Sequence, residues 1–358
     1  MIKYLIYCQL FFCCLPAINA VAQSSATFTN PLLPAGADPW CIYKNGFYYY
    51  THTTGKNITI WKTKSIAQLR TAQKKIVFTP PSTGPYSKEI WAPEIHWLQG
   101  KWYIYFAADS GNNVDHRLWV LENDAADPLD GEWKMKGKLT TPDDKWSIDG
   151  SVYEHNKQLY LIWSGWEGDI NFQQNIYICA MINPWTTTGA RVKISAPDLD
   201  WETHGDLDNP NDVPHVSVNE GPQILANKGN LFLIYSASGC WTEFYALGML
   251  TADADSNLMD PASWKKSPQP VFKKSDANKV YAPGHNSFFK SPDGKEDWIL
   301  YHANNREGEG CGEFRSPRAQ RFFWKPDGTP GFGTPVKPNA VIKIPSTIKK
   351  FNLRRSKM

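Results

Sequence analysis

The sequence of 358 residues carries little net charge, because 38 Lys and Arg nearly balance 35 Asp and Glu and leave a formal charge of +3. No basic stripe is present, which argues against a nucleic-acid partner. Long helical periodicity is also lacking, so an α-helical domain is not expected. The chain has no Cys-x-x-Cys pair, which excludes the common zinc and redox motifs that depend on it.

Cysteine is scarce in the part of the chain expected to remain after export. Three of the 7 Cys fall in the N-terminal segment. The remaining four are Cys41, Cys179, Cys240 and Cys311. An exported protein permits disulfides, but four Cys spread over a large domain do not form a disulfide framework. One bridge between Cys240 and Cys311 and four buried free thiols both remain open.

Residues 1–22 resemble a secretory signal peptide. Lys3 supplies the positive region, Leu5 to Pro16 forms the apolar region, and small residues precede Gln23. The apolar run is shorter than the roughly 20 residues that a membrane span needs. We therefore expect a secreted or periplasmic protein without a membrane span. One domain should cover residues 23–345, followed by a solvated basic tail, 346–358.

Five similar units follow one another from Asp38 onward. Each begins with a short strand opened by a polar or charged residue, continues through a polar turn into an aromatic strand, and ends with an outer strand. The opening residues are Asp38, Glu94, Asp149, Glu220 and His285, which are 56, 55, 71 and 65 residues apart. The last segment adds a closing strand at residues 340–344.

Units of this size are typical of the blades of a β-propeller. The sequence therefore predicts an all-β protein, a five-bladed β-propeller, in which the innermost strands line a central axis. Their opening residues should converge at one mouth of that axis. The alternative is a β-sandwich with a second domain, but the units run end to end without a break in composition.

Convergence would bring three carboxylates, Asp38, Asp149 and Glu220, around one pocket. Glycoside hydrolysis needs one carboxylic acid to protonate the leaving oxygen and one carboxylate to activate water. A third negative group raises the pKa of the acid. The longer Glu220 suits the acid, Asp38 before the rigid Pro39 suits the base, and Asp149 suits the tuning role. Taken alone, Glu220 would rather be read as a solvated residue at a strand end, because most Glu residues lie on the surface.

Five short motifs occur in an order and spacing that resembles glycoside hydrolase family 43. They are DPW at Asp38, WAPE at Trp91, IDGS at Ile148, NEGP at Asn219 and GHNS at Gly284. The resemblance covers about residues 30 to 345, and further stretches resemble the branch of exo-acting α-1,5-L-arabinofuranosidases. It implies a five-bladed propeller and inversion of configuration. It also implies Asp38 as general base, Asp149 as pKa modulator and Glu220 as general acid.

The resemblance further implies a metal ion on the axis, commonly calcium, which His285 reaches while waters fill the other positions. A hydrated ion beside three carboxylates is electrostatically reasonable. The alternative is that His285 only forms hydrogen bonds in a substrate pocket. No organic cofactor is expected.

Substrate-binding residues are also implied by the resemblance. Arg318 matches an arginine that contacts the acid or the sugar, although Arg315 and Arg321 lie close enough in the sequence to be alternatives. Trp91 and Trp166 are candidates for the walls of the sugar pocket, and ordinary packing is the alternative for each. Aromatic residues make up 14% of the chain, with 16 Trp, so rings for both purposes are plentiful.

The expected function is a secreted, inverting exo-glycosidase that releases L-arabinofuranose from α-1,5-linked arabinan or arabino-oligosaccharides, acting as a monomer. A loop at residues 200–214 would close one end of the groove. β-Xylosidase, endo-arabinanase and arabinoxylan arabinofuranohydrolase activities are alternatives, because loops decide among them. A hypothesis from another class is a propeller that binds sugar without hydrolysing it, but such a module would tolerate loss of a carboxylate.

Overall fold

The computed structural model describes residues 26–205 and 216–347. In this part the secondary structure is strand, interrupted only by short 3-10 helices of three to six residues, so the prediction of an all-β protein is confirmed. None of these helices is long and apolar enough to span a membrane. The expected signal peptide (1–22), all but two residues of the expected tail, and residues 206–214 of the expected loop lie outside the described residues.

In the described part, the strands form five antiparallel groups of four. The first is β2 (Ala37–Lys44), β3 (Phe47–Thr53), β4 (Ile58–Thr63) and β5 (Gln73–Phe78). The second is β6 (Lys88–Leu98), β7 (Lys101–Asp109), β8 (Arg117–Asn123) and β9 (Lys134–Leu139). The third is β10 (Ser147–His155), β11 (Gln158–Trp166), β12 (Gln173–Asn183) and β13 (Thr186–Ser195). The fourth is β14 (Ser217–Asn227), β15 (Asn230–Ala237), β16 (Ala246–Asp253) and β17 (Lys265–Lys266). The fifth is β18 (Tyr281–Lys290), β19 (Asp297–Asn304), β20 (Ser316–Trp324) and β21 (Pro330–Gly331).

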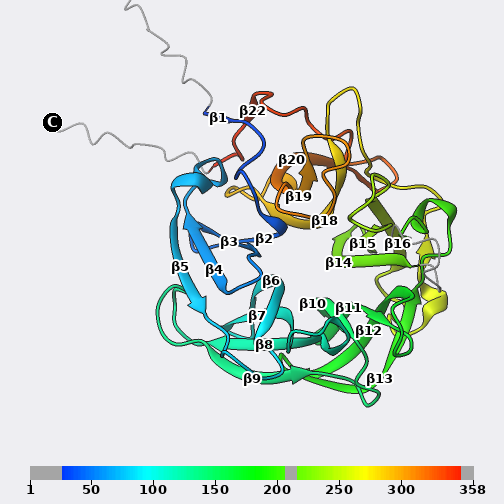
Figure 1. Ribbon diagram of the computed structural model, residues 1–358. Coiled ribbons are helices and arrows are strands. Elements are labelled where there is room, and N and C mark those ends of the chain that lie inside the picture. Colours follow the sequence, from blue (N-terminus) through cyan, green and yellow to red (C-terminus); the bar gives the residue numbers. More distant parts are fainter. Residues whose placement is uncertain (1–25, 206–215, 348–358) are drawn as a thin grey trace, which may run out of the picture.

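The groups lie around a common centre, and the first strand of each group is the innermost (Figure 1). A two-residue parallel pairing of β12 with β14 joins the third and fourth groups into one eight-stranded sheet. The predicted closing strand is found as β22 (Ile342–Lys343), which pairs with β1 (Thr27–Phe28). Four 3-10 helices lie between strands: η1 (Ile66–Thr71), η2 (Asn113–Asp115), η3 (Asp200–Glu202) and η4 (Pro261–Ser263).

The predicted polar turns between the first two strands are confirmed. In four groups the two central residues of the turn both have positive φ, which is the backbone of a two-residue hairpin turn. These pairs are Asn45–Gly46, Gln99–Gly100, Asn156–Lys157 and Lys228–Gly229. In the fifth group only Gly294 has positive φ, because the loop around it is longer.

The core lies between neighbouring groups of strands. Apolar side chains from the first and second groups, such as Ile60 and Ile104, are fully buried against one another. A matching cluster joins the fifth group to the first and includes Tyr50 and Leu300. The first sheet therefore has a neighbour on both faces, which explains why its strands are rich in apolar residues on both faces.

Each innermost strand has the same irregularity near its start. The pairing register shifts across a residue with left-handed backbone, and these residues are Asp38, Ala92, Asp149, Gly221 and His285, with φ of 55°, 42°, 55°, 57° and 49°. Strands β6 and β18 each have a second shift of this kind, at Glu89 and Ala282. A bulge of this kind bends the strand and re-aims a side chain. The structure corrects two of the residues that were predicted to open the units, Glu94 and Glu220. Glu94 lies two residues after its bulge position, and Glu220 lies one residue before, because sequence matching alone does not locate the extra residue.

Candidate active site

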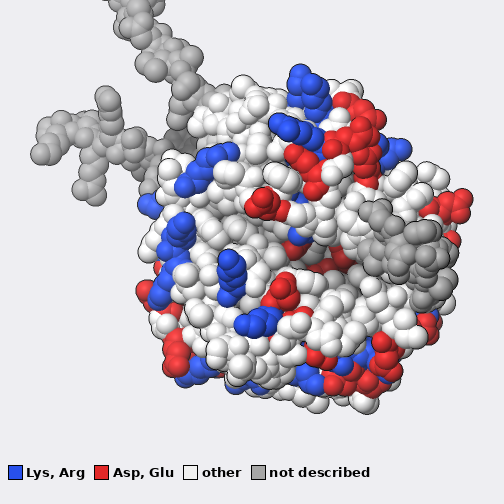
Figure 2. All heavy atoms as spheres, in the orientation of Figure 1, with Lys and Arg blue, Asp and Glu red and all other residues white. Residues whose placement is uncertain are grey.

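A pocket of about 400 Å³ opens at the starts of the innermost strands, a volume within the range of ligand sites. Figure 2 shows a hollow on this face of the molecule, with acidic side chains inside it. Sixteen residues line the pocket: Asp38, Thr53, Trp91, Asn113, Trp146, Ile148, Asp149, Trp166, Asn171, Gln174, Glu220, Cys240, Trp241, His285, Cys311 and Arg315. The predicted convergence of Asp38, Asp149, Glu220 and His285 is therefore present in the structure.

Asp38 is buried and surrounded by donors. Its Oδ1 lies 3.2 Å from Nη1 of Arg315 and 3.3 Å from Nδ1 of His285. The Thr53 hydroxyl donates to its Oδ2 at 2.5 Å. The backbone N–H of Asp38 donates to Nδ1 of His302 at 3.0 Å, which ties β2 to β19 of the fifth group. These contacts hold the carboxylate in one orientation.

The surroundings of Asp38 favour its ionised form. Burial alone would raise the pKa of this carboxyl group, but the charges of Arg315, His285 and His302, with the hydrogen bond from Thr53, hold the pKa well below its ordinary value. Asp38 is therefore an anion throughout the ordinary pH range, as a general base must be.

Glu220 is shifted in the opposite direction. Its side chain is partly exposed to the pocket and accepts a hydrogen bond from the Tyr245 hydroxyl at 2.7 Å. Burial raises the pKa of Glu220 to about 7, with the charge of Asp38 adding to the rise while Tyr245 and Arg315 oppose it. A carboxyl group that keeps its proton up to near-neutral pH can act as a general acid.

Asp149 lies close to Glu220 and His285. One carboxylate oxygen from each acid and one ring nitrogen of His285 all lie within 4.8 Å of one another. Its Oδ2 accepts the backbone N–H of Gly221 at 3.0 Å, directly after Glu220 in the chain. Burial raises the pKa of Asp149, and the charges of Glu220 and Asp38 raise it further. Near neutral pH the pair formed by Asp149 and Glu220 therefore carries one proton in total, because ionisation of one group opposes ionisation of the other.

Trp91 and Trp166, the two candidates for aromatic walls, both line the pocket. Trp166 stacks on Trp146 with ring centroids 4.5 Å apart, and Trp91 stacks on His116 at 4.0 Å. Three buried polar atoms of the pocket residues have no hydrogen-bond partner: Nε1 of Trp166, Oδ1 of Asn171 and Nε1 of Trp241. Buried polar atoms are usually paired, so these three atoms are exceptions among the residues of the pocket.

Arg315 occupies the position that sequence matching gave to Arg318. Arg318 is 0% exposed, does not line the pocket, and donates through Nη2 to Oδ1 of Asn305 at 2.6 Å. Arg315 lines the pocket and pairs with Asp38. The two arginines are three residues apart, and only the course of the chain before β20 decides which one faces the carboxylates.

Sequence reasoning also assigned no role to Tyr245, Trp241 or Thr53. Of the two alternatives for the cysteines, the structure has the Cys240–Cys311 disulfide, with Cys41 and Cys179 buried and free. The bridge joins the segment after β15, which carries Trp241, to the segment before β20, which carries Arg315. Two walls of the pocket are thereby linked covalently.

The residues around His285 offer a donor set that fits a hard cation. The imidazole of His285 lies in one cluster with the carboxylates of Asp149 and Glu220. Calcium takes six to eight mostly oxygen ligands, so these side chains would need several waters to complete a site. By contrast, the Glu94 and His96 pair is buried outside the pocket, with 2.9 Å between Oε2 and Nε2. Glu94, which was expected to converge with the other opening residues, therefore does not line the pocket.

Comparison with known proteins places these features in a family. The family model described as "Glycosyl hydrolases family 43" matches residues 28–330. The chain is 41% identical over 326 residues to the "Extracellular exo-alpha-(1->5)-L-arabinofuranosidase" of Streptomyces avermitilis, covering 89% of this chain and 66% of that protein. It thus spans just under two thirds of that relative's length.

Two further relatives are covered more fully. A protein of the same name from Streptomyces chartreusis is 39% identical over 292 residues, which are 80% of this chain and 86% of that protein. A solved structure described as "alpha-L-arabinofuranosidase from Lactobacillus brevis" superposes with a TM-score of 0.80 at 38% identity, covering 87% of this chain and 98% of that chain.

Proposed function

We propose, since this chain belongs to glycosyl hydrolase family 43, that it is an α-L-arabinofuranosidase. Its substrate is α-1,5-linked arabinan or arabino-oligosaccharide, from whose ends it releases L-arabinofuranose. The observation that carries the proposal is one pocket that holds a carboxyl group with a lowered pKa, Asp38, and one with a raised pKa, Glu220. The printed names of the Streptomyces relatives supply the sugar and the linkage.

In the proposed reaction Glu220 donates its proton to the glycosidic oxygen as the bond to the anomeric carbon breaks. Asp38 accepts a proton from a water molecule, which attacks the anomeric carbon from the opposite face. The products are the free sugar, with inverted configuration, and the shortened chain. Afterwards the proton on Asp38 returns to solvent and Glu220 regains one.

Asp149 is proposed to raise the pKa of Glu220 so that the acid is protonated before the reaction. The acid-competent state of the pair has the proton on Glu220 and the charge on Asp149. The hydrogen bond from the Gly221 N–H stabilises the ionised form of Asp149. The negative charge on Asp149 in turn opposes ionisation of Glu220, so the acid keeps its proton until the leaving oxygen takes it.

Sugar recognition is assigned to the aromatic walls and the unpaired polar atoms. Trp91, Trp166 and Trp241 offer flat apolar faces, and Nε1 of Trp166 and Trp241 can donate to sugar hydroxyl groups. Arg315 takes the role that the sequence gave to Arg318, since it alone of these two lines the pocket. His285 keeps its predicted place as a pocket residue.

The finer architecture proposed is a five-bladed β-propeller that extends over residues 23–345. Five groups of four strands around one centre support it. So do the apolar cluster between the fifth and first groups and the hydrogen bond from Asp38 to His302. These contacts join the beginning and end of the domain, as a closed ring of blades requires.

A calcium ion near His285, coordinated mostly by water, remains part of the proposal. Bound there, the ion would offset the negative charge clustered in the pocket. Export after loss of residues 1–22 and action as a monomer are proposed as well. The word "Extracellular" in the names of both Streptomyces proteins supports export.

Proton NMR of the purified protein with linear α-1,5-arabino-oligosaccharides tests the activity and the stereochemistry together. We expect free arabinose as the first product, appearing initially as the β-anomer. Initial release of the α-anomer would contradict Asp38 as a base. Release of xylose from xylo-oligosaccharides instead of arabinose would favour the β-xylosidase alternative, and binding without release would favour a carbohydrate-binding propeller.

A further inference from the structure

Glu202, at the end of η3, is fully buried and accepts hydrogen bonds from several groups. The Tyr235 hydroxyl donates to Oε1 at 2.7 Å, and the N–H groups of Asp198 and Leu199 donate to Oε2 at 3.1 and 3.0 Å. Nζ of Lys266 completes the set at 2.8 Å from Oε2. A buried carboxylate is costly unless it is paired and hydrogen-bonded. Glu202 meets both conditions, which makes its position well defined.

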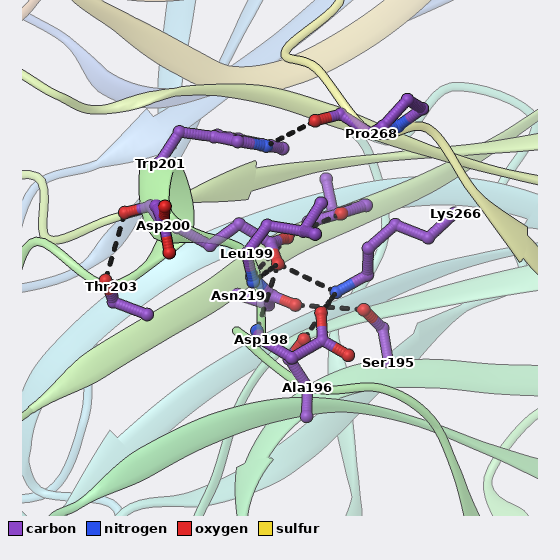
Figure 3. A network of polar contacts seen from close by, with 12 residues as sticks. Ser195, Ala196, Asp198, Leu199, Asp200, Trp201, Thr203, Asn219, Lys266 and Pro268 are labelled. Carbon is purple, nitrogen blue, oxygen red and sulfur yellow. Dashed lines mark hydrogen bonds and ion pairs between the residues drawn. The ribbon is translucent and has the colours of Figure 1, made fainter.

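A further donor to Glu202 among the described residues is Asn219, the residue directly before Glu220. Nδ2 of Asn219 donates to Oε1 of Glu202 at 3.2 Å, and its Oδ1 accepts from the Ser195 hydroxyl at 2.9 Å. Its backbone carbonyl accepts from the Ser164 hydroxyl at 2.8 Å. Figure 3 shows Asn219 between Ser195 and the segment at Asp198 and Leu199, with Lys266 alongside. Asn219 is 0% exposed, so its side chain and its carbonyl are both fixed.

Asn219 lies in β14 directly before the shift in register with β15. Asn219 and Glu220 are the last residues of β14 in regular register with β15 before the shift that extends to Gln223. Regular pairing resumes at Gln223, so on the Glu220 side of the shift only two pairs, Asn219 with Ala237 and Glu220 with Ser236, hold the strand against β15. The amide of Asn219, held by Glu202, adds a side-chain constraint to this short paired stretch.

We propose that Glu202 is a positioning residue for the general acid: through Asn219 it fixes the strand from which Glu220 reaches the glycosidic oxygen. The inference rests on the proposed role of Glu220 as acid. Glu202 does not line the pocket, so it acts on the reaction only through other residues. Lys266 takes part by balancing the buried charge, and it also binds Oδ1 of Asp198 at 2.6 Å.

The test is the substitution Glu202→Gln, assayed on two substrates that differ in leaving group. α-1,5-Arabinobiose has an alcohol leaving group that needs protonation, whereas 4-nitrophenyl α-L-arabinofuranoside has one that leaves with little help. A misplaced acid should lower kcat on arabinobiose about 10- to 100-fold, since small misplacements of catalytic groups cost this much. KM should change little, and kcat on the nitrophenyl substrate should fall less than about threefold.

The chain offers a matched control in Glu122 on β8. It is also buried, accepts the Tyr103 hydroxyl at 2.9 Å and pairs with Lys101 at 3.1 Å, but it does not line the pocket. Glu122→Gln should lower kcat equally on both substrates or on neither. Equal losses on both substrates for Glu202→Gln, or a profile like that of Glu122→Gln, would overturn the inference.

Two further variants keep the inference separate from the proposed function. Asn219→Ala should reproduce the leaving-group-dependent loss, and the double variant with Glu202→Gln should lose little more, because both act on one contact. Glu220→Gln should show the same dependence at greater size. If Glu220→Gln leaves arabinobiose hydrolysis unchanged, the proposed acid is wrong. If it abolishes hydrolysis while Glu202→Gln has no selective effect, only the inference fails.

Discussion

The guanidinium group of Arg315 lies 3.2 Å from the carboxylate of Asp38, although 277 positions separate the two residues in the chain. This contact is one of the causes of the lowered pKa of Asp38. It also connects the first innermost strand to the segment before β20. The disulfide at Cys311 holds the same segment. The charge state of the proposed base therefore depends on a part of the molecule distant in sequence.

Arg315→Ala should raise the pKa of Asp38 towards its ordinary value, because a positive charge is lost. Asp38 must be ionised to act as a base, so activity falls as pH drops through its pKa. The acid limb of the pH profile of kcat/KM should therefore move to higher pH, by about one unit or more. Arg321→Ala is the control, since Arg321 is exposed and pairs with Glu296 outside the pocket. An unmoved acid limb in Arg315→Ala would contradict this assignment.

Glu220→Gln should lower kcat on arabino-oligosaccharides about 10²- to 10⁴-fold, the usual contribution of a general acid. In the wild type the alkaline limb of the kcat/KM profile should lie near pH 7, where Glu220 loses its proton. An alkaline limb well above pH 8 would show that another group supplies the proton.

Glu220→Gln should also differ from the wild type in its free energy of unfolding, by an amount that depends on pH. The folded-state pKa of Glu220, about 7, lies above its unfolded value of about 4.3. The wild type therefore loses stability as pH rises between these values, because the buried carboxyl group must ionise. Glu220→Gln avoids this loss and should gain about 1–3 kcal/mol relative to wild type between pH 4 and pH 8. Denaturant unfolding at both pH values measures the difference, and a gain that is the same at both would argue against the raised pKa.

Reduction of the Cys240–Cys311 disulfide should lower both stability and activity. Loss of a native bridge commonly costs about 2–5 kcal/mol, and here it also frees the segments that carry Trp241 and Arg315. We expect a lower thermal midpoint and a higher KM for arabino-oligosaccharides. The double variant Cys240→Ser, Cys311→Ser is the control: its activity should already be reduced and should not respond to the reductant. A reductant effect of equal size in both proteins would point to another target.

Removal of divalent cations tests the proposed ion near His285. Chelation should lower the thermal midpoint and the activity, and added calcium should restore both. His285→Ala should abolish the response to chelator and to calcium. A wild-type protein that is indifferent to both reagents would leave His285 with only its hydrogen-bonding role beside Asp38.

Much of the fold could be predicted because its signals are local. The alternation of turn residues with aromatic strands marks each hairpin, and four of the turns have the left-handed backbone that their Gly or Asn residue favours. The fourth strands, such as β17 with two residues, were harder to locate because they are short and polar. The bulges were not predicted, since an extra residue in a strand leaves no signature in the pattern of residue types.

The sequence by itself determined which side chains can perform the chemistry. Asp38, Asp149, Glu220 and His285 were identified from their motifs, and the turn pattern placed each near the start of an innermost strand. What only the tertiary structure decided is how these groups are charged and aimed. Arg315, Tyr245, Glu202 and the disulfide reach the site from other strands and loops. A pKa and a side-chain direction depend on neighbours in space, and those neighbours exist only once the groups of strands have packed together.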